Sequence, residues 1–76
     1  MPFFTLMYNN EREMRVEVDE PEVQSKRLKN HILKHFDNIK YDDIILYIVD
    51  NGKAFSVDDN EMVDDEMDFI LEIDVD

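Results

Sequence analysis

The stretch Glu13–Pro21, with the sequence EMRVEVDEP, decides which fold the chain can adopt. Apolar side chains at Met14, Val16 and Val18 alternate with the charged residues between them. Because side chains in a strand point alternately to its two faces, this pattern predicts a strand with one buried and one solvated face. Pro21 fits the first turn of a helix, and the acidic residues around it favour the positive end of the helix dipole. The stretch therefore predicts a half-buried antiparallel strand followed by a helix.

The flanking segments extend this pattern in both directions. Residues 3–8 alternate and are rich in aromatic side chains, which predicts a first strand, and the polar residues 9–12 predict the turn of a hairpin. After Pro21, apolar residues recur at helical spacing. A helix is therefore expected from about Glu22 to Phe36.

Three further strands are expected in the second half of the chain. The apolar run at 43–49 predicts a central strand, and the Asn-Gly pair at 51–52 is a strong signal for a hairpin. The other two strands are expected at 54–57 and 67–75, separated by an acidic loop in which a helical turn at 61–63 is an open alternative. The predicted fold class is α+β, with one helix packed on a mixed sheet in the order β-β-α-β-β-β.

The composition excludes several classes of function. The chain has 76 residues, which predicts a single domain of residues 1–76. It has no Cys, which excludes disulfides and thiolate metal sites, and one glycine, Gly52, where phosphate-binding and dinucleotide-binding loops need several. No cofactor is therefore expected. The net charge of −12 repels nucleic acids and anionic membranes, so we expect protein partners with basic surfaces.

The sequence also indicates where in the cell the protein is expected. The longest apolar run, residues 44–49, is far too short to span a bilayer. The N-terminal residues lack the basic and apolar regions of a signal peptide. We therefore expect a soluble intracellular protein, either cytoplasmic or nuclear.

Two clusters could be taken for metal or catalytic sites. His31 and His35 share a helix face at a spacing that can hold a metal, but no evident third ligand accompanies them. Seven acids between residues 58 and 68 offer oxygen ligands for calcium without the mid-loop Gly and fixed spacing of an EF-hand. A catalytic carboxylate pair needs two distinct environments, for which a chain of this size leaves little room. We expect neither a metal site nor enzymatic activity.

The chain resembles the ubiquitin-like β-grasp family. The resemblance is carried by VDEP at Val18–Pro21, DNGKAF at Asp50–Phe55 and EMDFILEI at Glu66–Ile73, which look like the family's strand-to-helix junction, its Asp-Gly turn and its last strand. It implies a β-grasp fold over nearly the whole chain. Conjugated members of the family end in Gly-Gly, whereas this sequence ends Ile73-Asp74-Val75-Asp76, so conjugation is not expected.

A second branch of the same superfamily matches the charge. Acidic PB1-type domains carry a Tyr-x-Asp-x-Asp-Gly-Asp type cluster and dock basic partners. The segment from Tyr47 to Asp59 is similar at the positions Tyr47, Asp50, Gly52, Asp58 and Asp59. Lys53 stands where that pattern has an acid, so the match is partial.

The outer face of the sheet is the predicted binding site. The apolar residues expected there are Phe3, Met7, Leu46, Ile48 and Ile70. The acidic residues expected at its rim are Asp68 and Glu72, with Glu17. An exposed apolar patch with a polar rim usually marks an interface. This pattern predicts a protein–protein interaction module or adaptor.

Three alternatives stay open. The dense carboxylates could mimic nucleic acid and occupy the basic groove of a DNA- or RNA-binding protein. Five basic residues lie between 26 and 40, so the chain carries two oppositely charged regions that permit head-to-tail self-association. The small core would also suit a subunit of a larger assembly.

Overall fold

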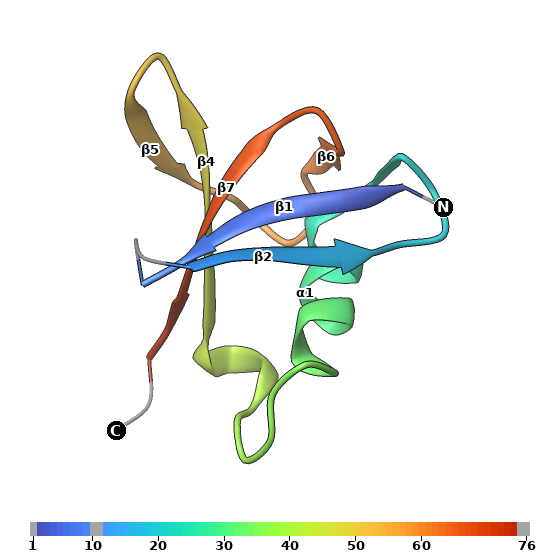
Figure 1. Ribbon diagram of the computed structural model, residues 1–76, viewed down its shortest axis with the longest axis vertical. Coiled ribbons are helices and arrows are strands. Elements are labelled where there is room, and N and C mark those ends of the chain that lie inside the picture. The colour runs from blue at the N-terminus through green and yellow to red at the C-terminus, as the bar shows by residue number, and fades with distance from the viewer. Residues whose placement is uncertain (1, 10–11, 75–76) are drawn as a thin grey trace.

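A computed structural model describes residues 2–9 and 12–74. The chain begins with a hairpin of two long strands (Figure 1). It ends with a strand that lies between this hairpin and the rest of the sheet. The bounds of the elements are β1 (Phe3–Tyr8), β2 (Arg12–Glu17), β3 (Glu22–Gln24), α1 (Ser25–Leu33), the 3₁₀ helix η1 (Tyr41–Asp43), β4 (Ile44–Asp50), β5 (Lys53–Ser56), β6 (Met62–Asp64) and β7 (Asp68–Ile73).

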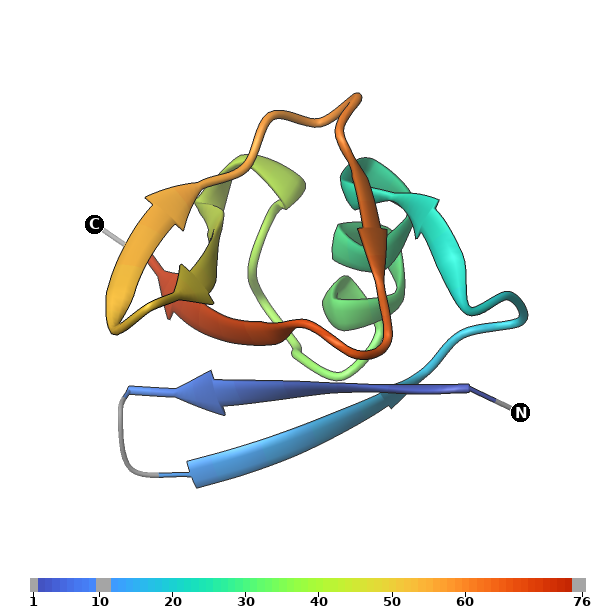
Figure 2. The ribbon, with the colours of Figure 1, turned by 90° about the horizontal axis from the view of Figure 1, so that it is seen from above.

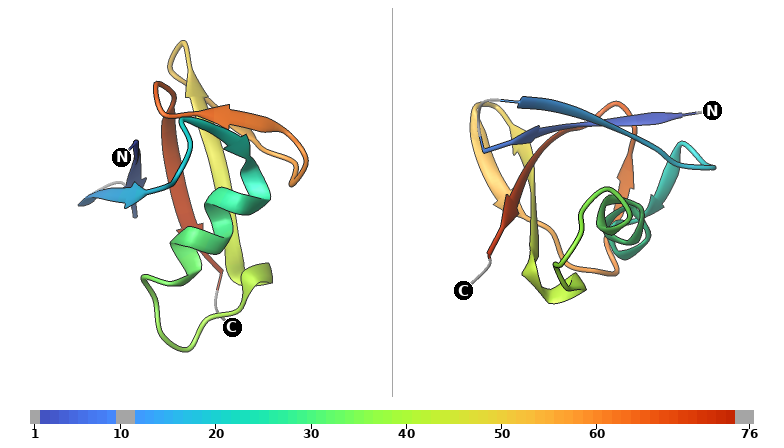
Figure 3. Two further views of the ribbon diagram at one scale, coloured as in Figure 1. Left: turned by 90° about the vertical axis from the view of Figure 1, so that its right-hand side faces the viewer. Right: turned by 60° about the horizontal axis from the view of Figure 1, so that its bottom comes forward.

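Five strands form one mixed sheet in the order β2-β1-β7-β4-β5. The pair β1–β7 is parallel, and the other three pairs are antiparallel. The helix α1 lies against one face of this sheet, and Figures 2 and 3 show that face curving around it. The predicted α+β class, with one helix packed on a mixed sheet, is therefore confirmed.

The core lies between the sheet and the helix. Alternate residues of each long strand point into it, as the period of two requires. The helix contributes Leu28 and Ile32, both fully buried. From the sheet come Phe4, Leu6, Val16, Ile44, Leu46, Phe69 and Leu71. The rings of Phe4 and Phe69 lie 6.0 Å apart between their centres.

The predicted start of the helix is wrong by three residues. Glu22–Gln24 is a strand that pairs with Met62–Asp64, and the helix begins at Ser25. The predicted order lacks these two short strands, and the alternative of a helical turn at 61–63 is also wrong. The pairing forms because Val23 and Val63 stand directly opposite each other and are both buried. A contact between distant parts of the chain thus overrides the local helical signal.

The first strand has its predicted bounds, Phe3–Tyr8, and the other predicted strands differ from theirs by one or two residues, whereas the helix ends at Leu33 rather than Phe36. The turn at Asn51-Gly52 has φ angles of 52° and 77°, as expected for the two-residue hairpin turn that Asn-Gly favours. β7 ends at Ile73, and Val75 lies outside the described residues. No helix in the described part of the chain is long and apolar enough to cross a membrane.

Candidate functional site

The outer face of the sheet carries a row of apolar side chains that crosses three strands. Met7 of β1 stands beside Ile70 of β7, and Ile70 stands beside Tyr47 of β4. Ile45 and Val49 flank Tyr47 on the same face because they lie two residues away on the same strand. All three residues of β4 are half-buried, as is Ile70, so part of each side chain is in contact with solvent.

Two of the predicted site residues do not lie on this face. Leu46 is 1% exposed and stands opposite the buried Leu71, and Ile48 stands opposite the buried Phe69 and packs against the core. The prediction that both point outward is therefore wrong. The apolar run of β4 has no polar residue to mark its solvent face, so only its pairing with β7 decides which residues point inward.

The other predicted residues do lie on the outer face. Phe3 and Met7 are 49% and 38% exposed, and Asp68, Ile70 and Glu72 alternate with the buried residues of β7. We define the outer-face patch as Phe3, Met7, Ile45, Tyr47, Val49 and Ile70. Sequence reasoning missed Ile45, Tyr47 and Val49. A register alignment of the runs 44–49 and 68–73 is the signal that could have found them.

Ile70 lies between two shallow hollows in this patch. One, of about 410 Å³, is lined on its apolar side by Met7, Val49 and Ile70. The other, of about 570 Å³, is lined by Ile45 and Ile70 among others. Ile70 is the one described residue that lines both hollows.

Carboxylates surround the patch. Glu17 stands opposite Phe3, and Glu13 stands opposite Met7, on the neighbouring strand β2. Asp68 lines the smaller hollow and Glu72 the larger one. The Tyr47 hydroxyl donates a long hydrogen bond of 3.4 Å to Glu72 Oε2. The rim is therefore acidic around most of the patch.

One basic residue accompanies these acids on the outer face of the described strands. Arg15 projects from β2 between Glu13 and Glu17, and its Nε lies 3.7 Å from Glu13 Oε1. Both side chains are well exposed, so the pair is solvated and contributes little to stability. The rim consequently keeps a net negative charge, which favours a partner with Lys or Arg around an apolar centre.

The acidic loop that follows β5 is bound to the start of the helix. Ser25 N donates to Glu61 O at 2.8 Å and Lys26 N donates to Asp59 O at 3.0 Å, which satisfies two amides at the helix N-terminus. The Ser25 hydroxyl donates to Asp58 O. These contacts give the loop a structural role within the chain.

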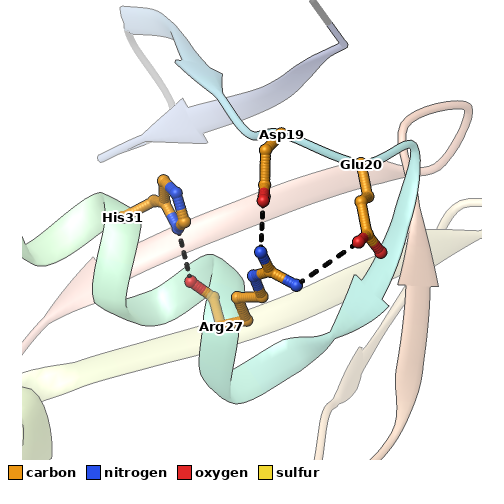
Figure 4. A network of polar contacts seen from close by, with 4 residues as sticks. All are labelled: Asp19, Glu20, Arg27 and His31. Atoms are coloured by element: carbon orange, nitrogen blue, oxygen red, sulfur yellow. Dashed lines mark hydrogen bonds and ion pairs between the residues drawn. The ribbon is translucent and has the colours of Figure 1, made fainter.

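The helix cations are also engaged within the chain. Arg27 forms ion pairs with Asp19 and with Glu20, the latter at 3.8 Å between Nη1 and Oε1 (Figure 4). Lys29 Nζ lies 3.0 Å from Asp59 Oδ1. These contacts use two of the five cations on which the head-to-tail alternative depends.

The histidines of the helix do not converge on a shared site. His31 Nδ1 donates to the backbone oxygen of Arg27 at 2.9 Å, one helical turn earlier, and Figure 4 shows this contact. His35 is exposed beyond the end of α1. Across residues 2–9 and 12–74, no group of three or more His, Asp or Glu side chains is arranged to hold a metal ion.

A comparison with protein-family models finds no match for this chain, and a comparison with curated proteins finds none either. The fold defines a small α+β domain with one helix on a mixed sheet. The outer-face patch and its charges are therefore the features that bear on its function.

Proposed function

We propose that this chain is a ubiquitin-like β-grasp domain that binds a protein partner through the outer-face patch. The strand order β2-β1-β7-β4-β5, with β1 and β7 parallel at its centre and α1 across one face, is compatible with a β-grasp. The domain acts as an interaction module or adaptor rather than as an enzyme.

The observation that carries the proposal is the position of Ile70. It lies at the centre of the apolar row, between Met7 and Tyr47, and forms part of both hollows. Partly exposed apolar side chains gathered on one face, with a polar rim, are typical of protein interfaces. The helix cannot cover this face because it packs on the other one.

The acidic rim indicates the chemistry of the partner. An apolar side chain that enters either hollow meets a carboxylate, Asp68 in one and Glu72 in the other. A partner surface with an apolar residue flanked by Lys or Arg would fill a hollow with the apolar side chain and pair with its carboxylate through the basic one. The charges would raise the association rate and fix the orientation, while the apolar contact would supply the affinity.

The experiment is a capture of partners from cell lysate with the wild type, Ile70→Asp and a control variant. Met62→Asp is the matched control because Met62 is 51% exposed on β6, away from the outer face. We expect one partner to bind the wild type and Met62→Asp at low and high salt, and to be lost with Ile70→Asp. A partner that Ile70→Asp retains would contradict the proposal.

The same experiment tests the nucleic-acid mimic. A mimic would bind through its carboxylates, so its partner would be released by salt, displaced by DNA and insensitive to Ile70→Asp. The pairing of Asp59 with Lys29, and of Asp19 and Glu20 with Arg27, leaves fewer free carboxylates for such a role.

A further inference from the structure

The strand β5 forms an open edge of the sheet. It is the last strand in the order β2-β1-β7-β4-β5, and all four of its residues are exposed. Figure 1 shows the β4–β5 hairpin projecting at one side, with no described element outside β5. Phe55, in the middle of this strand, is 52% exposed. An uncovered edge with an apolar side chain is a template for pairing with another strand.

The register shows which backbone groups face the open side. Val57 N donates to Leu46 O at 3.3 Å, so these two residues form a hydrogen-bonded position of the β4–β5 ladder. Hydrogen-bonded positions alternate in an antiparallel pair, so Phe55 also bonds toward its neighbour Ile48. The N–H and C=O groups of Ala54 and Ser56 therefore point away from β4.

We propose that β5 pairs antiparallel with β5 of a second copy of this chain, about a two-fold axis through Phe55. In this register Ala54 of each copy exchanges hydrogen bonds with Ser56 of the other. The two Phe55 residues then stand opposite each other at a non-hydrogen-bonded position, where side chains approach most closely. Both exposed rings become buried against each other.

The local sequence is complementary to itself in this register. Lys53 comes opposite Val57 of the second copy, beside the acidic loop that begins at Asp58. Lys53 is the one basic residue after position 40, so self-pairing brings it next to carboxylates at both ends of the interface, where it offsets only a small part of the repulsion between two chains of net charge −12. Isologous two-fold dimers of this kind are the commonest form of self-association.

The dimer would be weak and would strengthen with salt. Four residues of edge bury much less than the ~1,200 Å² of a standard interface, so we expect a dissociation constant on the order of 10⁻⁴ M. Each copy carries a net charge of −12, and salt screens this repulsion. Head-to-tail association of the helix cations with the acidic loop would instead weaken with salt.

This self-pairing is independent of the proposed function, because β5 lies beyond β4 and its pairing leaves the outer-face patch uncovered. Directly opposed residues in an antiparallel pair point to the same side of the sheet. The two outer-face patches would therefore face the same direction, and the dimer could engage a partner at two points.

Sedimentation equilibrium over a range from about 10 μM to about 1 mM, at low and high salt, tests the proposal. We expect dimerisation in the wild type, at least tenfold weakened by Phe55→Ser and by Ala54→Pro, which removes an outward N–H. Met62→Ser is the matched control, because Met62 is 51% exposed against 52% for Phe55, and it should dimerise like the wild type.

Amide hydrogen exchange gives a second measurement. It reports whether the outward N–H groups of β5 form hydrogen bonds, which a contact between apolar side chains alone would not produce. Exchange at Ala54 and Ser56 should slow as the concentration of the wild type rises, and should not do so in Phe55→Ser. A wild type that stays monomeric to about 1 mM would overturn the proposal. A dimer that both variants retain, or one that salt dissociates, would also overturn it.

Discussion

The side chains of Lys29 and Asp59 form an ion pair, with 3.0 Å between Nζ and Oδ1, that joins the helix α1 to the acidic loop. Lys29 is only 11% exposed at its side chain although it is charged. Its Nζ also lies 5.6 Å from the centre of the Tyr41 ring, a distance at which cation and ring attract each other. The pair therefore links α1, η1 and the loop at one point.

Removing the charge of Lys29 should destabilise the domain. Lys29→Met keeps the aliphatic stem but loses the ion pair and the cation–ring contact, so we expect a loss of about 1 kcal/mol in the free energy of unfolding. Urea denaturation followed by circular dichroism measures this loss. Lys34→Met, at an exposed position one residue beyond α1, is the control and should change stability by less than about 0.5 kcal/mol. Equal effects of the two variants would refute a special role for Lys29.

The contribution of Asp59 should depend on pH in the acid range. The hydrogen bond from Lys29 Nζ, with the Tyr41 hydroxyl nearby, lowers the pKa of the Asp59 carboxyl in the folded protein. A lowered pKa means that the stabilisation is present above the pKa of the unfolded chain and is lost as the pH falls through the folded pKa. Asp59→Asn should thus be less stable than the wild type at neutral pH, and this difference should begin to shrink as the pH falls below about 4 and vanish below the lowered pKa of the folded protein. A difference that is constant down to about pH 2 would rule this out.

Tyr41 should make the fold sensitive to alkali. Burial raises the pKa of Tyr41 to about 12, and the nearby Asp59 carboxylate adds to the rise. A raised pKa means that the folded state holds the phenol proton more tightly than the unfolded chain does, so the free energy of unfolding should decline as the pH rises from about 10 to about 12.

Tyr41→Phe tests this sensitivity. The Tyr41 hydroxyl is buried without a hydrogen-bond partner among the described residues, so its removal should cost little at neutral pH. In thermal melts between about pH 9 and about pH 12, the variant should show a shallower decline than the wild type. Identical declines would show that Tyr41 does not contribute to the alkaline response.

Substitutions at two neighbouring residues of β7 should differ sharply in their effect on the free energy of unfolding. Leu71 is fully buried, so Leu71→Ala should cost roughly 2–5 kcal/mol through lost burial and a cavity. Ile70 lies partly exposed on the outer face, so Ile70→Ala should cost less than about 1.5 kcal/mol. Denaturant midpoints measure both. Similar losses would indicate that Ile70 is as well packed as Leu71.

Part of the candidate site follows from the sequence alone. In β7, Asp68 and Glu72 mark the solvent face, so the outward position of Ile70 between them could be predicted. In β1, the outward positions of Phe3 and Met7 follow from the same period of two and from the hairpin with the alternating β2. These assignments hold because charged residues mark one face of β2 and of β7, and the pairing of β1 with β2 extends that face to β1.

The sequence alone did not determine which residues of β4 point toward the core, or the residue at which the helix begins. Every residue from Ile44 to Val49 is apolar or aromatic, so shifting the strand by one residue exchanges its faces without burying a charged side chain from this run. The pairing of Leu46 with Leu71, and of Val23 with Val63, decides both matters. Local periodicity fixes a face only where polar and apolar residues alternate; elsewhere, contacts between segments far apart in the chain choose the arrangement that buries most apolar surface.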